Sequence, residues 1–222
     1  MKKYCVMTAL VFLMVLRMQT GVMAQNQAPI FVNMYKNVSS AGETYGISFD
    51  LSDDALKKVT RVYIQGPKGA RIWVNNTLNL NDMLLSAVNL PIDEFNRWFP
   101  AGNYKITLTP ASLGSLKISM THDFPSTPAI LYPLEGSTDV PTNPVITWMP
   151  VTGIISLYLQ LKDDVGFVFG VNLPINATSY SVPANLLRGN TKYEVSLAAK
   201  VADSYSNRLV TTSIISFTTV VQ

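Results

Sequence analysis

The sequence has little with which to build cross-links or a reactive centre. Of its 222 residues, one is cysteine and one is histidine, and charged residues make up only 14%. The one cysteine, Cys5, lies at the extreme N-terminus, so the rest of the chain forms no disulfide and offers no thiol nucleophile. Such a chain must be stabilised by burial of apolar side chains alone, which two domains of about 100 residues each can achieve.

The first 24 residues have the pattern of a secretory signal peptide. Lys2 and Lys3 precede an apolar run at residues 6–16, and residues 22–24 (Val-Met-Ala) offer small side chains at the usual cleavage positions. A retained membrane anchor needs about 20 apolar residues, whereas Arg17 interrupts this run. We therefore expect cleavage after residue 24.

The predicted leader also accounts for the basic charge balance. It contains three basic residues and no acid, so the 17 basic and 14 acidic residues of the full chain become 14 and 14. A neutral net charge gives no electrostatic reason to expect nucleic acid or anionic lipid as a partner. The C-terminus has no apolar stretch long enough to anchor the chain. We expect a bacterial protein that is secreted or periplasmic, with no integral membrane segment after cleavage and with no cofactor.

Residues 25–124 predict a first domain made of β-strands. The clearest signal is an alternating pattern that places Tyr45, Ile47 and Phe49 on one face of a strand. One or two helical turns are expected at residues 90–99. Further strands, with turn signals between most of them, are expected at residues 30–35, 59–65, 70–74, 104–108 and 116–124. This pattern is typical of an antiparallel β-sandwich.

A short proline-bearing linker at residues 125–128 predicts the boundary, and it should hold the two domains at a restricted angle. Residues 129–222 then predict seven strands, including one in which Tyr193, Val195 and Leu197 face inward. Seven strands in about 95 residues is the count of a constant-type sandwich. The predicted fold class is all-β, with two tandem antiparallel β-sandwich domains.

Three short motifs in residues 128–220 carry a family resemblance. Trp148 follows Pro-Val-Ile-Thr in a short apolar strand, residues 187–193 (LRGNTKY) form a turn that ends in Tyr193, and residues 216–219 read Ser-Phe-Thr-Thr. With these motifs the region resembles the fibronectin type III family, or the looser bacterial fibronectin-like group. The family usually has proline where this chain has Gly189, but the spacing from leucine to tyrosine is kept. The resemblance implies an immunoglobulin-like sandwich with an interaction or spacer role and no active site.

His122 is the only imidazole available as a catalytic base. It lies between Met120 and Phe124 at strand spacing, which is more typical of a structural position than of a catalytic one. We therefore expect no catalytic residue in the chain.

Several acidic residues are candidates for metal ligands or glycosidase residues. Asp53-Asp54 and Asp163-Asp164 each follow a predicted strand and could offer oxygens to calcium, but neither pair has the further spaced carboxylates of a dedicated loop. Aspartate also favours turns by bonding its own backbone, so we expect turn residues and no metal site. Glycoside hydrolysis needs two acids that converge across a cleft, which a sequence does not show, and Asp93-Glu94 and Glu43 are interpreted as ordinary surface acids.

Four aromatic residues form the candidate ligand-binding set: Tyr35, Trp73, Trp98 and Tyr158. Each lies on the strand or helix face opposite the inferred core. Carbohydrate-binding sandwiches stack sugars on such rings, although single aromatics on a surface are also common.

The sequence therefore predicts an exported, non-catalytic binding, adhesion or scaffold module whose partner is a protein or a carbohydrate. Two alternatives stay open: a secreted hydrolase or accessory domain with a site in residues 25–124, and a passive spacer or assembly subunit. No stretch of the chain indicates a particular reaction or ligand.

Overall fold

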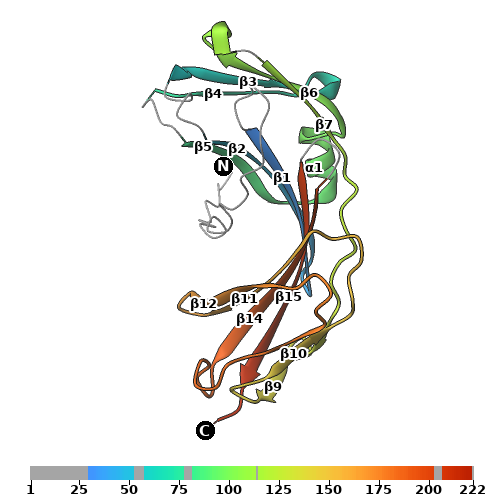
Figure 1. Cartoon of the computed structure of the whole chain (residues 1–222), viewed down its shortest axis with the longest axis vertical. Helices are drawn as coiled ribbons and strands as arrows, with labels where there is room; N and C mark the ends of the chain where they lie inside the picture. The colour runs from blue at the N-terminus through green and yellow to red at the C-terminus, as the bar shows by residue number, and fades with distance from the viewer. Residues whose placement is uncertain (1–29, 53–57, 78–81, 114, 203–206, 222) are drawn as a thin grey trace, which may run out of the picture.

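The computed structural model describes residues 30–52, 58–77, 82–113, 115–202 and 207–221. The predicted signal peptide and Asp53-Asp54 lie outside these ranges. Within them the chain is almost entirely β-structure and folds into two antiparallel β-sandwiches, one above the other in Figure 1. The predicted all-β class is confirmed. The predicted helix is also present, as α1 (Ile92–Trp98).

The N-terminal sandwich consists of a three-stranded and a four-stranded layer. The first contains β1 (Ile30–Ser39), β2 (Gly42–Ser52) and β5 (Asp82–Leu90), and the second has the order β4 (Arg71–Asn75), β3 (Arg61–Gln65), β6 (Gly102–Thr109) and β7 (Ser115–Met120). Short 3-10 turns, η2 (Pro67–Gly69) and η3 (Ala111–Leu113), follow β3 and β6. Alternation along each strand buries one face, so Ile47, Phe49, Ile64 and Ile106 meet in the core between the layers.

The C-terminal sandwich repeats this plan. One layer contains β8 (Ile130–Tyr132), β10 (Val145–Trp148) and β13 (Ser179–Ser181), and the other contains β12 (Phe167–Leu173), β11 (Ser156–Asp163), β14 (Lys192–Ala202) and β15 (Arg208–Thr219). In both sandwiches the first, second and fifth strands form one layer, and the third, fourth, sixth and seventh form the other. The extra strand β9 (Ser137–Val140) pairs with β15 in parallel.

Trp148 and Tyr193 occupy the core of the C-terminal sandwich, as predicted. Trp148 is 2% exposed, and its indole N–H donates to the carbonyl of Ala177 at 2.8 Å. Tyr193 is 1% exposed, and its hydroxyl accepts a hydrogen bond from the Arg188 amide at 2.8 Å. This bond closes the predicted turn onto the strand that follows it, which is the arrangement of a tyrosine corner.

The N-terminal sandwich has a similar corner, built around Tyr104. The Tyr104 hydroxyl donates to the carbonyl of Pro100 at 2.8 Å, and burial raises the pKa of this phenol. Gly66 packs directly on the ring: a Cβ at this position would lie 2.3 Å from a ring carbon of Tyr104. Any larger residue would force the ring to move, so the corner depends on Gly66 as well as on the tyrosine.

The two sandwiches share one sheet, which the sequence did not predict. The first half of β15 pairs in parallel with β1, from Asn33 with Arg208 to Val38 with Ser213. A continuous path therefore runs β12-β11-β14-β15-β1-β2-β5. Leu209, near the start of β15, belongs to the N-terminal core, whereas Phe217, near its end, belongs to the C-terminal core. Strand β15 is thus part of both sandwiches.

The segment between β7 and β8 adds further contacts along this shared region. Thr211 on β15 donates its hydroxyl to the carbonyl of Pro125 in this segment at 2.9 Å. On β7 itself, the carbonyl of Ser119 accepts a hydrogen bond from the Asn207 side chain at 2.5 Å. The predicted strand at residues 116–124 ends earlier than expected, because β7 stops at Met120.

Candidate functional site

Trp73 lies on the outer face of the four-stranded sheet β4-β3-β6-β7. Antiparallel pairing places it directly opposite Tyr63 on β3, and Tyr63 is opposite Thr107 on β6. The Trp73 side chain is 63% exposed, because the neighbouring position Ile72 turns inward and packs against the core. A tryptophan and a tyrosine on adjacent strands therefore present aromatic rings on one side of the sheet.

Basic side chains surround this aromatic pair on the same face. The register places Arg71, Gln65, Lys105 and Lys117 in a row across the four strands. On the other side of the Trp73–Tyr63 row, the Arg61 Nε donates to Asn75 Oδ1 at 2.9 Å. The sequences of the four strands contain no aspartate or glutamate. We call this surface the basic sheet face; it comprises Arg61, Tyr63, Gln65, Arg71, Trp73, Lys105 and Lys117.

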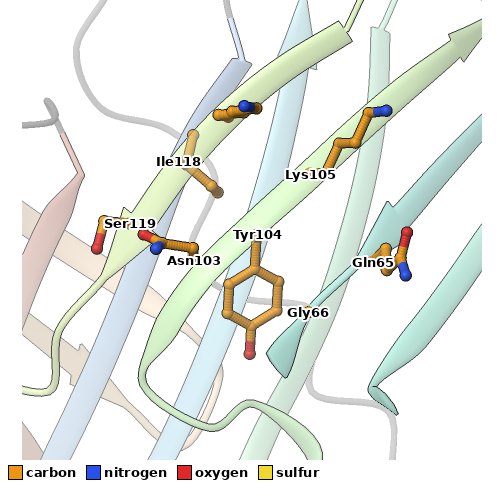
Figure 2. Close-up of a pocket in the computed structure, with 8 residues that line it drawn as sticks. Gln65, Gly66, Asn103, Tyr104, Lys105, Ile118 and Ser119 are labelled. Carbon is orange, nitrogen blue, oxygen red and sulfur yellow. The ribbon is translucent and has the colours of Figure 1, made fainter. Parts of the chain in front are cut away.

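A shallow depression of about 450 Å³ opens at one end of the basic sheet face. Gln65, Asn103, Lys105 and Ser119 contribute to its lining from three neighbouring strands, as Figure 2 shows. Asn103 and Ser119 are register partners on β6 and β7, next to the row that contains Lys105 and Lys117. The depression thus extends the basic face with amide and hydroxyl groups that can donate hydrogen bonds.

The other predicted tryptophan, Trp98, lies outside this face. It is the last residue of α1 and is 57% exposed, with the guanidinium of Arg97 5.4 Å from its ring centroid. The structure therefore confirms that both tryptophans are exposed but places them on separate elements.

Tyr35 and Tyr158 lie on the outer face of the shared sheet, three strand steps apart, which corresponds to roughly 15 Å. Both are half-buried. The Tyr35 hydroxyl is 2.9 Å from Ser48 Oγ, and burial raises its pKa. The Tyr158 ring lies over β12, where only the absence of a side chain at Gly170 leaves room for its hydroxyl. The four predicted residues thus fall on three surfaces, and two are less accessible than the sequence suggested.

No known protein family matches the chain, and no curated protein is detectably similar in sequence. Among solved structures, the chain resembles a two-domain fibronectin type III segment of chicken tenascin, with 13% identity over 78% of this chain and 91% of that one and a TM-score of 0.29. It also resembles the BSP domain of a biofilm associated protein, with 12% identity over 84% of this chain and 28% of that one and a TM-score of 0.28. The FN1–FN3 domains of chicken CNTN1 match with 14% identity over 86% and 65% of the two chains and a TM-score of 0.28.

We therefore assign the fold from the strand order and the corner contacts of the chain itself. Seven strands in two layers, a buried Trp148 and the Tyr193 corner all match the predicted resemblance. The C-terminal sandwich is fibronectin type III-like. The N-terminal sandwich shares its strand order and has a corner tyrosine of its own, Tyr104.

In the fibronectin type III-like sandwich, Asp163 serves as a turn residue. One carboxylate oxygen accepts the amides of Val165 and Gly166 at 2.9 Å each, and the other accepts the Arg188 guanidinium at 2.7 Å. These bonds, led by the one from Gly166, lower the pKa of Asp163. Within the described ranges, no three His, Cys, Asp or Glu side chains are grouped to hold a metal ion.

His122 is held by the N-terminal sandwich. Its Nε2–H donates to the carbonyl of Phe99 at 3.0 Å, and its ring centroid lies 5.0 Å from that of Phe95. Burial lowers the pKa of this imidazole. These contacts support the structural role that the sequence indicated. Glu43, one of the acids considered for hydrolysis, instead pairs with Lys36 at 2.9 Å and accepts the Tyr45 hydroxyl at 2.6 Å.

Proposed function

We propose that the protein is an exported, non-catalytic binding module that recognises a protein or glycan partner outside the cytoplasm. The observation that carries this proposal is the basic sheet face, where an exposed tryptophan stands beside a tyrosine and four cationic side chains. Exposed aromatic and arginine side chains are enriched where proteins bind partners. The paired strands fix the backbone from which these side chains project, so no backbone segment of this face has to be ordered on binding.

The shared sheet supports a scaffold role for the same module. Because β15 contributes to both cores, the two sandwiches are expected to keep a fixed relative orientation. A fixed orientation would present the basic sheet face and the far end of the C-terminal sandwich at a constant separation. The described part of the chain contains no helix with the length and hydrophobicity required to span a bilayer.

The contacts of His122 support the non-catalytic part of the proposal. A general base needs an imidazole nitrogen within reach of the proton that it removes. In this chain Nε2 faces the Phe99 carbonyl, and the ring packs on Phe95. The same residue supplies a clear test, because it is the only histidine.

The test compares turnover with retention. Purified exported protein is incubated with ester, peptide and glycoside substrates, and is separately passed over immobilised polysaccharides and envelope proteins. We expect retention on at least one surface, no turnover, and the same retention for His122→Gln. Turnover that disappears in His122→Gln would refute the proposal. Absence of retention on all of the surfaces tested would also refute it.

A further inference from the structure

The basic sheet face has a charge arrangement that works against the fold. Lys105 on β6 and Lys117 on β7 are direct register partners, both are exposed, and Arg71 lies in the same row on β4. Like charges directly opposite each other on neighbouring strands are destabilising. An anion bound over this row would remove the repulsion, so the face is complementary to a negatively charged partner.

The four strands that carry these cations contain no acidic residue that could neutralise them. The ion pairs Lys36–Glu43, Lys162–Glu194 and Arg188–Asp163 all lie away from the basic sheet face. The other outward positions of the four strands are filled by amide, hydroxyl and aromatic side chains. The chain without its predicted leader is neutral overall, but four of its 14 basic residues lie on this sheet, whose strands contain no acid.

The aromatic row runs alongside the cationic row. Trp73 and Tyr63 are opposite each other; Trp73 is two residues along its strand from Arg71, and Tyr63 is two residues from Gln65, the uncharged member of the row that also contains Lys105 and Lys117. Strands are spaced about 4.8 Å apart and residues two apart along a strand about 7 Å. A chain-like ligand that lies across the strands could therefore place its rings over Trp73 and Tyr63 and its acidic groups over the neighbouring cations, about 7 Å away along the strands.

From this juxtaposition we propose that the basic sheet face binds an acidic polysaccharide, a polymer whose sugars carry carboxylate or sulfate groups. The proposal rests on the proposed function and adds its site and ligand class. Sugar rings present C–H faces that stack on Trp73 and Tyr63, while their acid groups pair with Arg71, Lys105 and Lys117. Asn103 and Ser119 in the adjoining depression supply hydrogen bonds to sugar hydroxyls. An anionic membrane has charge but no flat rings, and an exported protein meets surface polysaccharides before it meets nucleic acid.

The experiment measures affinity for five probes by isothermal titration calorimetry at two salt concentrations. The probes are alginate (a polyuronate), dextran sulfate, neutral dextran, an oligothymidylate and phosphatidylglycerol vesicles. We expect alginate or dextran sulfate to bind, neutral dextran not to bind, and added salt to weaken the interaction because exposed charge pairs are screened. A preference for alginate over dextran sulfate identifies carboxylates as the acidic groups, and the reverse preference identifies sulfates.

Matched variants locate the site, since α1 offers a second arginine and a second exposed tryptophan. Arg71→Gln and Lys105→Gln should each weaken binding by about threefold, and Trp73→Ala by about tenfold. Arg97→Gln and Trp98→Ala should leave the affinity unchanged. All five positions are exposed, so equal thermal unfolding midpoints are expected and confirm that each variant is folded.

Several results would overturn the inference. These are equal losses in the α1 variants, equal binding of neutral dextran, tighter binding of the oligothymidylate or the vesicles, or no binding of either acidic polymer. Retention on another glycan or on a protein, without binding of an acidic polymer, would reject this inference and leave the proposed function standing. Binding of an acidic polymer together with histidine-dependent turnover would have the opposite meaning, because the site would be correct and the non-catalytic function wrong.

Discussion

Tyr35 on β1 is the register partner of Val210 on β15, although 175 positions of sequence separate them. This parallel pairing joins the first strand of one sandwich to the last strand of the other. Next to it, Leu209 is 1% exposed and lies in the N-terminal core. The stability of the N-terminal sandwich therefore depends on residues near the end of the chain.

Replacing Leu209 by alanine should consequently destabilise both sandwiches. We expect a loss of about 2–5 kcal/mol in the free energy of unfolding, because a large buried side chain is removed. Hydrogen exchange should show reduced amide protection in β1 and β2 as well as in β15. Val221→Ala, at a residue that is 70% exposed, serves as the control and should have little effect. Changes in exchange confined to residues 129–221 would show that the shared sheet does not couple the sandwiches.

The two corner tyrosines should behave alike on removal of the hydroxyl. Tyr193→Phe keeps the ring in the core but leaves the Arg188 amide without its acceptor, and Tyr104→Phe leaves the Pro100 carbonyl without its donor. Each change should lower the free energy of unfolding by about 0.5–1.5 kcal/mol. Urea denaturation measures the difference. Denaturation midpoints equal to the wild-type value would mean that these bonds contribute nothing to stability.

Trp148 and Trp98 form a contrasting pair for stability. Trp148→Ala should cost about 3–5 kcal/mol because it opens a cavity in the C-terminal core. Trp98→Ala removes a ring that is 57% exposed and should cost less than about 1 kcal/mol. Acrylamide should fail to quench Trp148 in a folded protein that carries Trp73→Phe and Trp98→Phe. Efficient quenching would mean that Trp148 is accessible and that the core assignment is wrong.

The lowered pKa of His122 predicts a pH dependence with a definite sign. Burial favours the neutral imidazole in the folded state, so the unfolded chain binds a proton more readily. Stability should therefore be highest above the unfolded pKa of about 6.5 and should fall as the pH drops through the lower folded value. Chemical denaturation between pH 7.5 and 5.5 tests this, with His122→Gln as the control that lacks this component. A stability that rises on acidification in the wild type alone would contradict the assignment.

Local patterns predicted much of the fold. Alternation identified the inward positions of β2 and β14, and the short motifs around Trp148 and Tyr193 predicted their burial correctly. Strand β5 was missed because its sequence, DMLLSAVNL, has apolar residues on both faces, with Leu84 and Val88 exposed. Strand β9 is only four residues long and carries little pattern. The β1–β15 pair joins distant residues, so no local pattern could indicate it.

The candidate site needed the strand register as well as the sequence. Trp73 was identified from its outward position, but Tyr63, Lys105 and Lys117 come from three other strands and join its face only through pairing. The neutral net charge concealed them, because the balancing acids lie elsewhere. The outward positions of β3, β4, β6 and β7 contain basic residues and no acid, which is a signal in the sequence once the end of β7 at Met120 is known.

The fluorescence of Trp73 tests the central claim most directly. In a Trp98→Phe protein, Trp148 is buried and Trp73 is the remaining exposed indole. Titration with alginate or dextran sulfate should produce a saturable change in emission that high salt reverses, and neutral dextran should produce none. The length of the polymer should not change during the titration, because a non-catalytic module does not cleave its ligand. An unchanged Trp73 signal at acidic-polymer concentrations that saturate calorimetric binding would place the ligand elsewhere and contradict the account.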